Sequence, residues 1–105
     1  MKTRVTAYGA CVTVSVNDGV LPIATADMDR MGDKWWLARL VVKKPHRGKG
    51  IGRELVAKLK ENAGGFPIEV MPGGYDLTKE EQFAFYEKCG FKKVDENTLI
   101  LQTKG

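Results

Sequence analysis

The N-terminal part of the chain alternates between apolar and polar residues with a period of about two, the spacing of a β-strand. Residues 4–16 follow this pattern along their length and predict one strand. Its apolar face consists of Val12, Val14 and Val16. Residues 17–19 read Asn-Asp-Gly, which favours a hairpin turn, and residues 20–26 then predict the returning strand. Pro22 within that strand indicates an edge position or a bulge.

The next two segments differ in polarity. Residues 27–33 are mostly polar and predict a turn, although they include two methionines. Residues 35–42 are apolar apart from Arg39 and predict a third strand. A continuous apolar run of this length is typical of a central strand that is covered on both faces.

After the third strand the apolar period changes from two to about 3.6, which is the period of a helix. From about residue 50 to residue 63 the apolar side chains form one stripe and predict an amphipathic helix. The stripe consists of Ile51, Leu55, Leu59 and Ala63, with Val56 beside it. Gly64 and Gly65 end the helix, and residues 66–71 predict a short strand.

A second helix is predicted from Thr78 to Cys89. Thr78 and Glu81 have the spacing of a capping box, in which each side chain accepts a hydrogen bond from the other residue's backbone N–H group. Gly90 suits the position that follows the last helical turn. Both ends of this helix are therefore marked in the sequence.

Residues 91–94 and 98–102 predict a hairpin at the C-terminal end. The predicted order is then β-β-β-α-β-α-β-β, without an internal repeat, a linker or a low-complexity segment. We therefore expect one α/β (α+β) domain over residues 1–105, built as a mixed, mostly antiparallel sheet flanked by two helices.

The composition suits a soluble globular domain. Of the 105 residues, 43% are hydrophobic and 29% are charged. No apolar run approaches the roughly 20 residues of a membrane-spanning helix, and the first residues do not lead into a signal-peptide core. Cys11 and Cys89 are too few for a disulfide scaffold, so we expect both to be reduced and the protein to be cytoplasmic.

The net charge of +4 is concentrated in one segment, residues 43–60, which holds a single acidic residue, Glu54. Its basic residues are Lys43, Lys44, Arg47, Lys49, Arg53, Lys58 and Lys60. Such a cluster suits a phosphorylated cofactor or a nucleic acid. We favour the cofactor, because the cluster coincides with a glycine-rich turn and lacks a known nucleic-acid-binding motif.

That turn lies between the apolar strand and the amphipathic helix. Gly48, Gly50 and Gly52 leave no Cβ between the backbone and a ligand. The first N–H groups of a helix have no partner within it and carry a partial positive charge, so the turn is a candidate phosphate site. The sequence matches neither a Walker loop, which needs Ser or Thr after its glycines, nor a dinucleotide fingerprint, which needs a third glycine at or beyond Arg53.

Two motifs resemble the GCN5-related N-acetyltransferase (GNAT) family. The first is formed by Arg47, Gly50 and Gly52 and is similar to the Arg-x-x-Gly-x-Gly loop that binds the pyrophosphate of acetyl-CoA. The second, residues 85–91, reads Phe-Tyr, three residues and Gly-Phe, as family members commonly do after the cofactor helix. The two motifs occur in the expected order among the expected β-α-β-α-β-β elements, so the chain is identified as a member over about residues 12–103.

The resemblance implies an N-acetyltransferase that moves an acetyl group from acetyl-CoA (coenzyme A) directly to a primary amine of a small molecule or a protein. It implies cofactor binding by Leu40, Val41, Val42, Arg47, Gly48, Lys49, Gly50, Ile51 and Gly52, without a metal. In this scheme the backbone edge of residues 40–42 pairs with the pantetheine arm, and a backbone N–H group of Val41 or Val42 polarises the thioester carbonyl. Tyr86 is implied as the general acid, although a core aromatic is the alternative interpretation.

An amine acceptor also needs a base, because a lysine-like amine is almost fully protonated at pH 7. Glu69 is our first choice as a second catalytic residue, since it points away from the apolar side of its strand. Asp33 and Asp76 are alternatives, and each of the three carboxylates is also consistent with a solvated surface group. His46 is expected to contact the phosphates and not to act as the base.

Several features depart from the family pattern. Members usually begin with a strand and two helices that form a wall of the acceptor site, whereas residues 1–9 supply at most a strand. Trp36 stands where histone-type members carry a base glutamate, and Lys79 stands where an asparagine is often found. An inactive CoA-binding interaction module is therefore an alternative, and a basic nucleic-acid-binding domain is a second one. A sheet flank left uncovered near Trp35, Trp36 and residues 28–31 predicts a homodimer.

Overall fold

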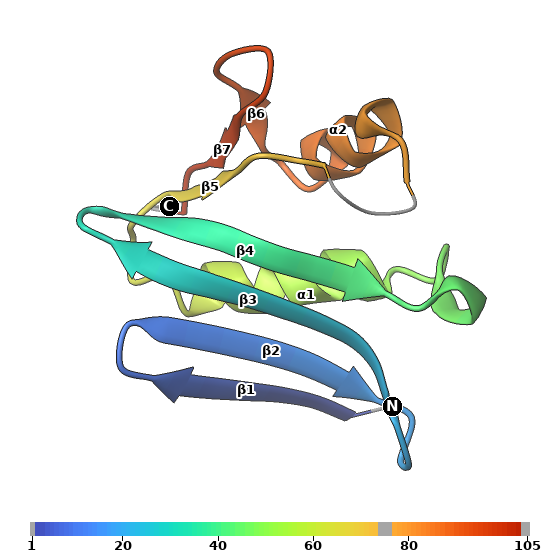
Figure 1. The fold of residues 1–105 in the computed structure, drawn as a ribbon. Coiled ribbons are helices and arrows are strands. Elements are labelled where there is room, and N and C mark those ends of the chain that lie inside the picture. The colour runs from blue at the N-terminus through green and yellow to red at the C-terminus, as the bar shows by residue number, and fades with distance from the viewer. Residues whose placement is uncertain (1, 74–76, 104–105) are drawn as a thin grey trace.

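The structure, a computed structural model, describes residues 2–73 and 77–103. Its strands form one sheet in the order β1-β2-β3-β4-β5-β7-β6 (Figure 1). Neighbouring strands are antiparallel except β4 and β5, which are parallel. The predicted fold class, a mixed and mostly antiparallel sheet with two helices, is confirmed.

The elements are β1 (Lys2–Tyr8), β2 (Cys11–Asn17), β3 (Pro22–Met31), β4 (Lys34–Val42), the short 3₁₀ helix η1 (Lys44–His46), α1 (Ile51–Glu61), β5 (Ile68–Val70), α2 (Lys79–Lys88), β6 (Lys92–Lys93) and β7 (Leu99–Leu101).

The N-terminal part contains one strand more than the sequence pattern predicted. Residues 4–16 are not one strand, because β1 and β2 are joined by a tight turn at Gly9 and Ala10, and Gly9 has a φ of 59°. The phase of the alternation changes at this turn. Apolar residues occupy odd positions up to Ala7 and even positions from Val12, and these two residues pair across the hairpin. This change of phase was the signal for the turn.

Residues 27–33 are not a turn either. β3 continues to Met31, and only Gly32 and Asp33 form the turn to β4. Met28 within this segment is fully buried, whereas the aspartates on either side of it lie on the opposite, partly exposed face of the sheet. The polar residues therefore mark one face of a strand, which is why the interpretation as a turn was wrong.

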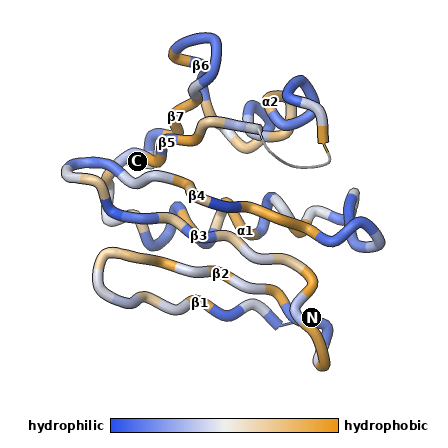
Figure 2. The backbone as a smooth tube through the Cα atoms, in the orientation of Figure 1, coloured by the Kyte–Doolittle hydropathy of each residue, from blue (hydrophilic) through white to orange (hydrophobic). Residues whose placement is uncertain are grey.

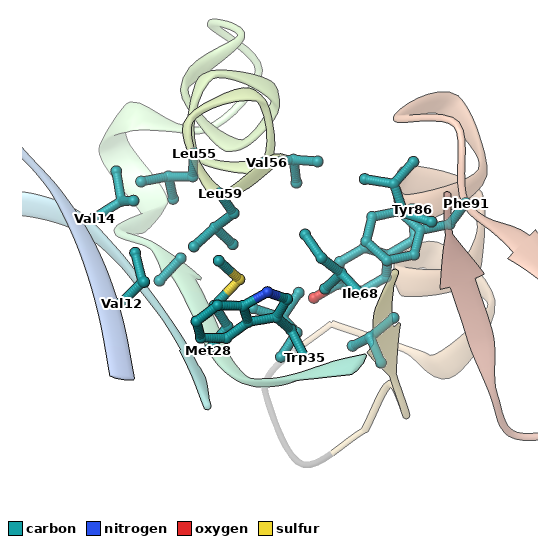
Figure 3. Packing of buried hydrophobic residues seen from close by; sticks show 14 of the residues in the cluster. Val12, Val14, Met28, Trp35, Leu55, Val56, Leu59, Ile68, Tyr86 and Phe91 are labelled. Atoms are coloured by element: carbon teal, nitrogen blue, oxygen red, sulfur yellow. The ribbon is translucent and has the colours of Figure 1, made fainter. Parts of the chain in front are cut away.

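The core lies between α1 and one face of β2, β3 and β4 (Figure 1). The predicted helix stripe is buried, and so is the predicted valine face of β2. Figure 3 shows Leu55 and Leu59 of α1 above Val12 and Met28. The same cluster continues through Trp35 and Ile68 to the aromatic residues next to and within α2. Burial of one large apolar side chain stabilises a fold by about 1.5–3 kcal/mol, so this layer is the main source of stability.

The ends of α2 are formed by the predicted residues. The Thr78 side chain accepts a hydrogen bond from the Glu81 backbone N–H group at 3.1 Å, and the Glu81 side chain accepts one from the Thr78 N–H group at 3.0 Å. After the helix, Gly90 has a φ of 100°, a conformation that glycine adopts without steric cost. The capping box therefore sets where the helix starts.

Candidate functional site

The site is organised by the separation of β4 from β5. The two strands pair at two positions only, Trp35 with Ile68 and Trp36 with Glu69. β5 ends at Val70, whereas β4 continues to Val42, and Figure 1 shows the strands diverging beyond the paired part. The second half of β4 is therefore not covered on both faces, contrary to the prediction. Arg39 is exposed and residues 40–42 are half-buried.

The first pocket has a volume of about 560 Å³ and lies at the end of β4. Its wall consists of the end of β4, the loop that follows, the first turn of α1 and one side of α2. It is lined by eight of the predicted cofactor residues, namely Leu40, Val41, Val42, Arg47, Gly48, Gly50, Ile51 and Gly52. Lys49 is exposed and is not among the residues that line it. The structure thus brings together residues that the family resemblance had grouped.

The loop before α1 is held in a shape that exposes its backbone. Gly48 and Gly50 have φ values of 77° and 81°, and Gly50 is the N-cap of the helix. Because Gly50 has no side chain, it leaves the first N–H groups of α1 available to an anion. Arg47 fixes the loop to the strand, since its Nε donates a hydrogen bond to the Val42 carbonyl at 2.9 Å. Figure 2 shows this hydrophilic loop directly after the apolar end of β4.

Gly52 differs from Gly50 in what surrounds it. A Cβ at Gly50 would have no heavy atom within 4 Å, whereas a Cβ at Gly52 would lie 2.9 Å from two ring carbons of Phe85. The φ of Gly52 is not positive, so its backbone conformation does not require glycine. Gly52 therefore permits the first turn of α1 to approach α2. The sequence motif suggested a ligand contact for both glycines and did not reveal this packing role.

The electrostatics of the first pocket favour an anionic ligand. His46, Arg47, Arg53 and Lys88 line it. The acidic residue in its wall is Glu81, whose carboxylate accepts the capping-box hydrogen bond. Backbone N–H groups at a helix start together with basic side chains form an anion-binding arrangement. Lys88 and the α2 side of this wall were not predicted, since their nearness to the loop depends on the packing of two helices.

Tyr86 lies both in the core and at the pocket. Its side chain is 6% exposed, and its ring contacts those of Phe85 and Phe91 edge to face, with centroids 5.1 and 5.2 Å apart. Figure 3 shows Tyr86 next to Phe91 and Ile68. The same residue lines the first pocket. A packing role and a role at the site are therefore compatible for this residue.

A second pocket of about 250 Å³ lies where β4 and β5 separate. Residues 37–40 form one side, residues 70–73 form the other, and α2 contributes two side chains. The two pockets share Leu40, Gln82 and Tyr86, so they meet at one point. Gln82 was not predicted as a site residue. Its spacing of four residues from Tyr86, which puts both on one side of the helix, was the available signal.

The predicted bases are not brought into this arrangement. Glu69 lines neither pocket, and its carboxylate forms an ion pair with Lys34. It lies on the part of β5 that is still paired with β4, before the strands separate. Asp33 is exposed in the β3–β4 turn, and Asp76 lies outside the described residues. Within the described chain no carboxylate lines the second pocket, so a base role for Glu69 stays a prediction.

Cys11 and Cys89 are free thiols, and partial burial raises the pKa of both, so they carry little thiolate at neutral pH. Among the described residues, no helix is long and apolar enough to cross a membrane.

A protein-family model described as an acetyltransferase (GNAT) domain matches residues 8–93. A search of curated proteins gives no match. The fold is shared with several solved structures. The PaiA N-acetyltransferase of Thermoplasma acidophilum, in complex with coenzyme A, has 21% identity and a TM-score of 0.74, and the match covers 91% of this chain and 62% of that one. An aminoglycoside 6'-N-acetyltransferase complexed with coenzyme A has 20% identity and a TM-score of 0.79, with 91% and 74% covered.

The anti-CRISPR protein AcrVA5 is also similar, with 18% identity and a TM-score of 0.69. That match covers 86% of this chain and 98% of AcrVA5. The chain therefore spans nearly the whole of AcrVA5 but less than two thirds of PaiA. All three identities are below 25%, so these likenesses show the fold.

Proposed function

Because the chain belongs to the GNAT family of acetyl-CoA-dependent N-acetyltransferases, we propose that it transfers an acetyl group from acetyl-CoA directly to a primary amine. The observation that carries this proposal is the meeting of two pockets at Leu40, Gln82 and Tyr86. The first pocket contains the helix start suited to an anion, and we call it the donor pocket. The second pocket suits the acceptor, and we call it the acceptor pocket. Direct transfer requires such a junction, since amine and thioester must come within bonding distance.

The donor is held in the first pocket. The N–H groups at the start of α1 and the loop glycines bind the pyrophosphate, and the basic side chains around the pocket balance its charge. The free backbone edge of residues 40–42 pairs with the pantetheine arm as an added strand would. Coenzyme A is present in the PaiA and aminoglycoside acetyltransferase structures, which supports this assignment.

The transfer forms a C–N bond to the acceptor amine and breaks the C–S bond of the thioester. A backbone N–H group of Val41 or Val42 stabilises the negative charge that develops on the carbonyl oxygen. Tyr86 gives a proton to the departing sulfur. A phenol has a pKa of about 10 and a thiol of about 8.5, so this proton is shared in a strong hydrogen bond as the C–S bond breaks.

The amine must lose a proton before it attacks. Glu69 lines neither pocket, and its carboxylate is paired with Lys34. The second pocket lies between diverging strands, and we assign proton acceptance to water there. This assignment is an alternative to base catalysis by Glu69, and the Glu69→Gln variant distinguishes the two.

Acetyl-CoA turnover and CoA binding together test the proposed function. Thiol release from acetyl-CoA is followed with a panel of amines that includes aminoglycosides, polyamines and lysine-containing peptides, and CoA affinity is measured by calorimetry. Binding with turnover of one amine class supports the transferase. Binding without turnover on any amine favours the inactive CoA-binding module. Salt-dependent binding of DNA or RNA without CoA binding favours the nucleic-acid-binding domain.

We place this reaction in the cytoplasm. Cys11 and Cys89 are free thiols, and free thiols persist where the compartment is reducing. Fractionation of cells that express the protein tests this location, and recovery from an oxidising compartment would contradict it.

We also propose a homodimer, on a surface different from the predicted one. Of the residues in the predicted surface, Trp35 and Met28 are 7% and 0% exposed, Trp36 is half-buried and Met31 is 54% exposed, so the apolar area there is smaller than predicted. All of β1 is exposed, its outer edge has no partner strand among residues 2–73 and 77–103, and Tyr8 is 85% exposed. Edge strands of this kind pair readily with another strand.

The β1 sequence is compatible with antiparallel pairing to a second copy about Val5. In that register Lys2 faces Tyr8 and Thr3 faces Ala7, so no like charges are opposed. Light scattering at high micromolar concentration should give twice the monomer mass, and Val5→Lys should restore the monomer. A wild-type monomer under these conditions would contradict the proposal.

A further inference from the structure

Gln82 belongs to neither sequence motif, yet it occupies the junction of the two pockets. Its side chain is 7% exposed and lines both of them. It lies one helical turn before Tyr86 on the same side of α2. A buried polar side chain normally has hydrogen-bond partners that explain its position, and Gln82 has two.

The Gln82 amide binds the main chain of the segment between β5 and α2. Its Oε1 accepts a hydrogen bond from the Gly73 N–H group at 3.0 Å, and its Nε2 donates one to the Leu77 carbonyl at 3.1 Å. Gly73 lines the second pocket and Leu77 lines the first. One side chain therefore ties a wall of each pocket to the helix that carries Tyr86.

The chemistry of the amide explains why glutamine suits this position. A primary amide offers an acceptor and a donor on one planar group, and both are used here. A carboxylate offers acceptors only, and a methionine of similar length offers neither strong donor nor strong acceptor. Replacement by glutamate thus removes the donor, and replacement by methionine removes both the donor and the acceptor.

We propose that Gln82 is a positioning residue for acetyl transfer. By holding Gly73 and Leu77 it fixes the acceptor-pocket wall relative to Tyr86 and to the donor pocket. This inference rests on the proposed function. It implies that Gln82 governs turnover with the amine more than affinity for CoA, because neither hydrogen bond reaches the loop and helix start that would hold the pyrophosphate. Misplacement of reacting groups by about 1 Å lowers rates by up to about 100-fold.

The test compares Gln82→Met, which loses both hydrogen bonds, with Gln82→Glu, which keeps an acceptor for Gly73. Glu87→Met is the matched control, since Glu87 is exposed on the same helix and lines neither pocket. Three quantities are measured in each. They are hydrogen exchange of the Gly73 amide by NMR, CoA affinity by calorimetry, and kcat/KM for the amine identified in the acceptor screen.

For Gln82→Met we expect faster Gly73 exchange, a loss of about 10- to 100-fold in kcat/KM, and CoA affinity within about threefold of wild type. Gln82→Glu should keep the Gly73 protection and show a smaller loss of turnover, and Glu87→Met should match wild type. If Gln82→Met does not fold, Gln82→Glu still tests the Leu77 hydrogen bond through kcat/KM at saturating acetyl-CoA, where an effect of its added charge on CoA affinity is removed.

If the wild-type enzyme is active and folded Gln82→Met has the same turnover, the positioning role is overturned and the proposed function is not. A parallel loss of CoA affinity would also overturn it, because Gln82 would then act in donor binding. A wild-type protein that turns over no amine would overturn the proposed function and the positioning role with it.

Discussion

The two pockets are built from the chain in opposite ways. Most of the donor pocket wall comes from one continuous stretch, residues 40–53, and its ligand groups are backbone amides and nearby basic side chains. The acceptor pocket is assembled from three segments that are distant in sequence, residues 37–40, residues 70–73 and α2. On the proposed assignment, recognition of the donor is a local property of the chain, whereas recognition of the acceptor depends on how strands and helices are placed.

The two pockets also differ in charge. The donor pocket has several basic side chains, whereas the described lining of the acceptor pocket has one charged residue, Arg39. That guanidinium is paired with Asp27, with an Nη2–Oδ2 distance of 2.7 Å, and Asp27 also accepts a hydrogen bond from Thr13 at 2.7 Å. The charge of the donor pocket thus favours an anion, and on our proposal the acceptor pocket selects more by shape and contact than by net charge.

Gly50→Glu should have the largest effect and should affect the donor pocket only. The carboxylate would meet the pyrophosphate, and opposing like charges costs several kcal/mol, so CoA affinity should fall by at least about 100-fold. The left-handed conformation of residue 50 adds a folding cost of about 1–2 kcal/mol. Calorimetry measures the affinity, and Gly50→Ala controls for the backbone strain. Unchanged CoA affinity in folded Gly50→Glu would refute the phosphate-loop assignment.

Tyr86→Phe should lower turnover and leave the donor pocket intact. Loss of a general acid costs about 10²–10⁴ in rate, and we expect the lower end because a thiolate leaves readily. The ring keeps its contacts with Phe85 and Phe91, so stability should change by about 1 kcal/mol or less. Single-turnover thiol release is the appropriate measurement, since slow product release can hide the effect. A rate within twofold of wild type would assign Tyr86 to packing alone.

Gly52→Ala should destabilise the fold more than it weakens ligand contacts, in contrast to Gly50→Glu. The added Cβ would lie 2.9 Å from the Phe85 ring, and overpacking of this kind costs about 1–3 kcal/mol. Thermal or denaturant unfolding measures the loss. Phe85→Leu in the same chain should recover part of it, because the two positions are in contact. If the changes in unfolding free energy of Gly52→Ala and Phe85→Leu simply add in the double variant, the clash with the ring is not the cause of the lost stability.

Glu69→Gln should have the smallest effect on activity. Glu69 lines neither pocket, and an ion pair of this kind contributes about 1 kcal/mol or less. We expect kcat/KM for the amine to stay within about twofold of wild type across the neutral pH range. A loss of about 100-fold would restore Glu69 as the base and would extend the acceptor site to the paired part of β5.

The sequence was most informative where a structure depends on neighbouring residues. The capping box at Thr78 and Glu81 marked the start of α2, because its hydrogen bonds join residues three apart. The turn between β1 and β2 was missed because it is marked at Gly9 by a change of phase in the apolar alternation and not by a change of composition. Glu69 was predicted as the base because it points away from the apolar side of its strand, next to the expected separation of the strands, and the sequence does not say how far that strand pairs with β4.

By itself the sequence determined the family, through the resemblance of its two motifs, and the order of most elements, because glycine spacing, helix caps and apolar periods act through local backbone geometry. Only the tertiary structure decided that β4 and β5 pair at two positions and then diverge, that Gly52 packs against Phe85, and that Gln82 reaches Gly73. These features join residues far apart in the chain. Their contacts are set by the packing of α1 and α2 against the sheet, which no local pattern records.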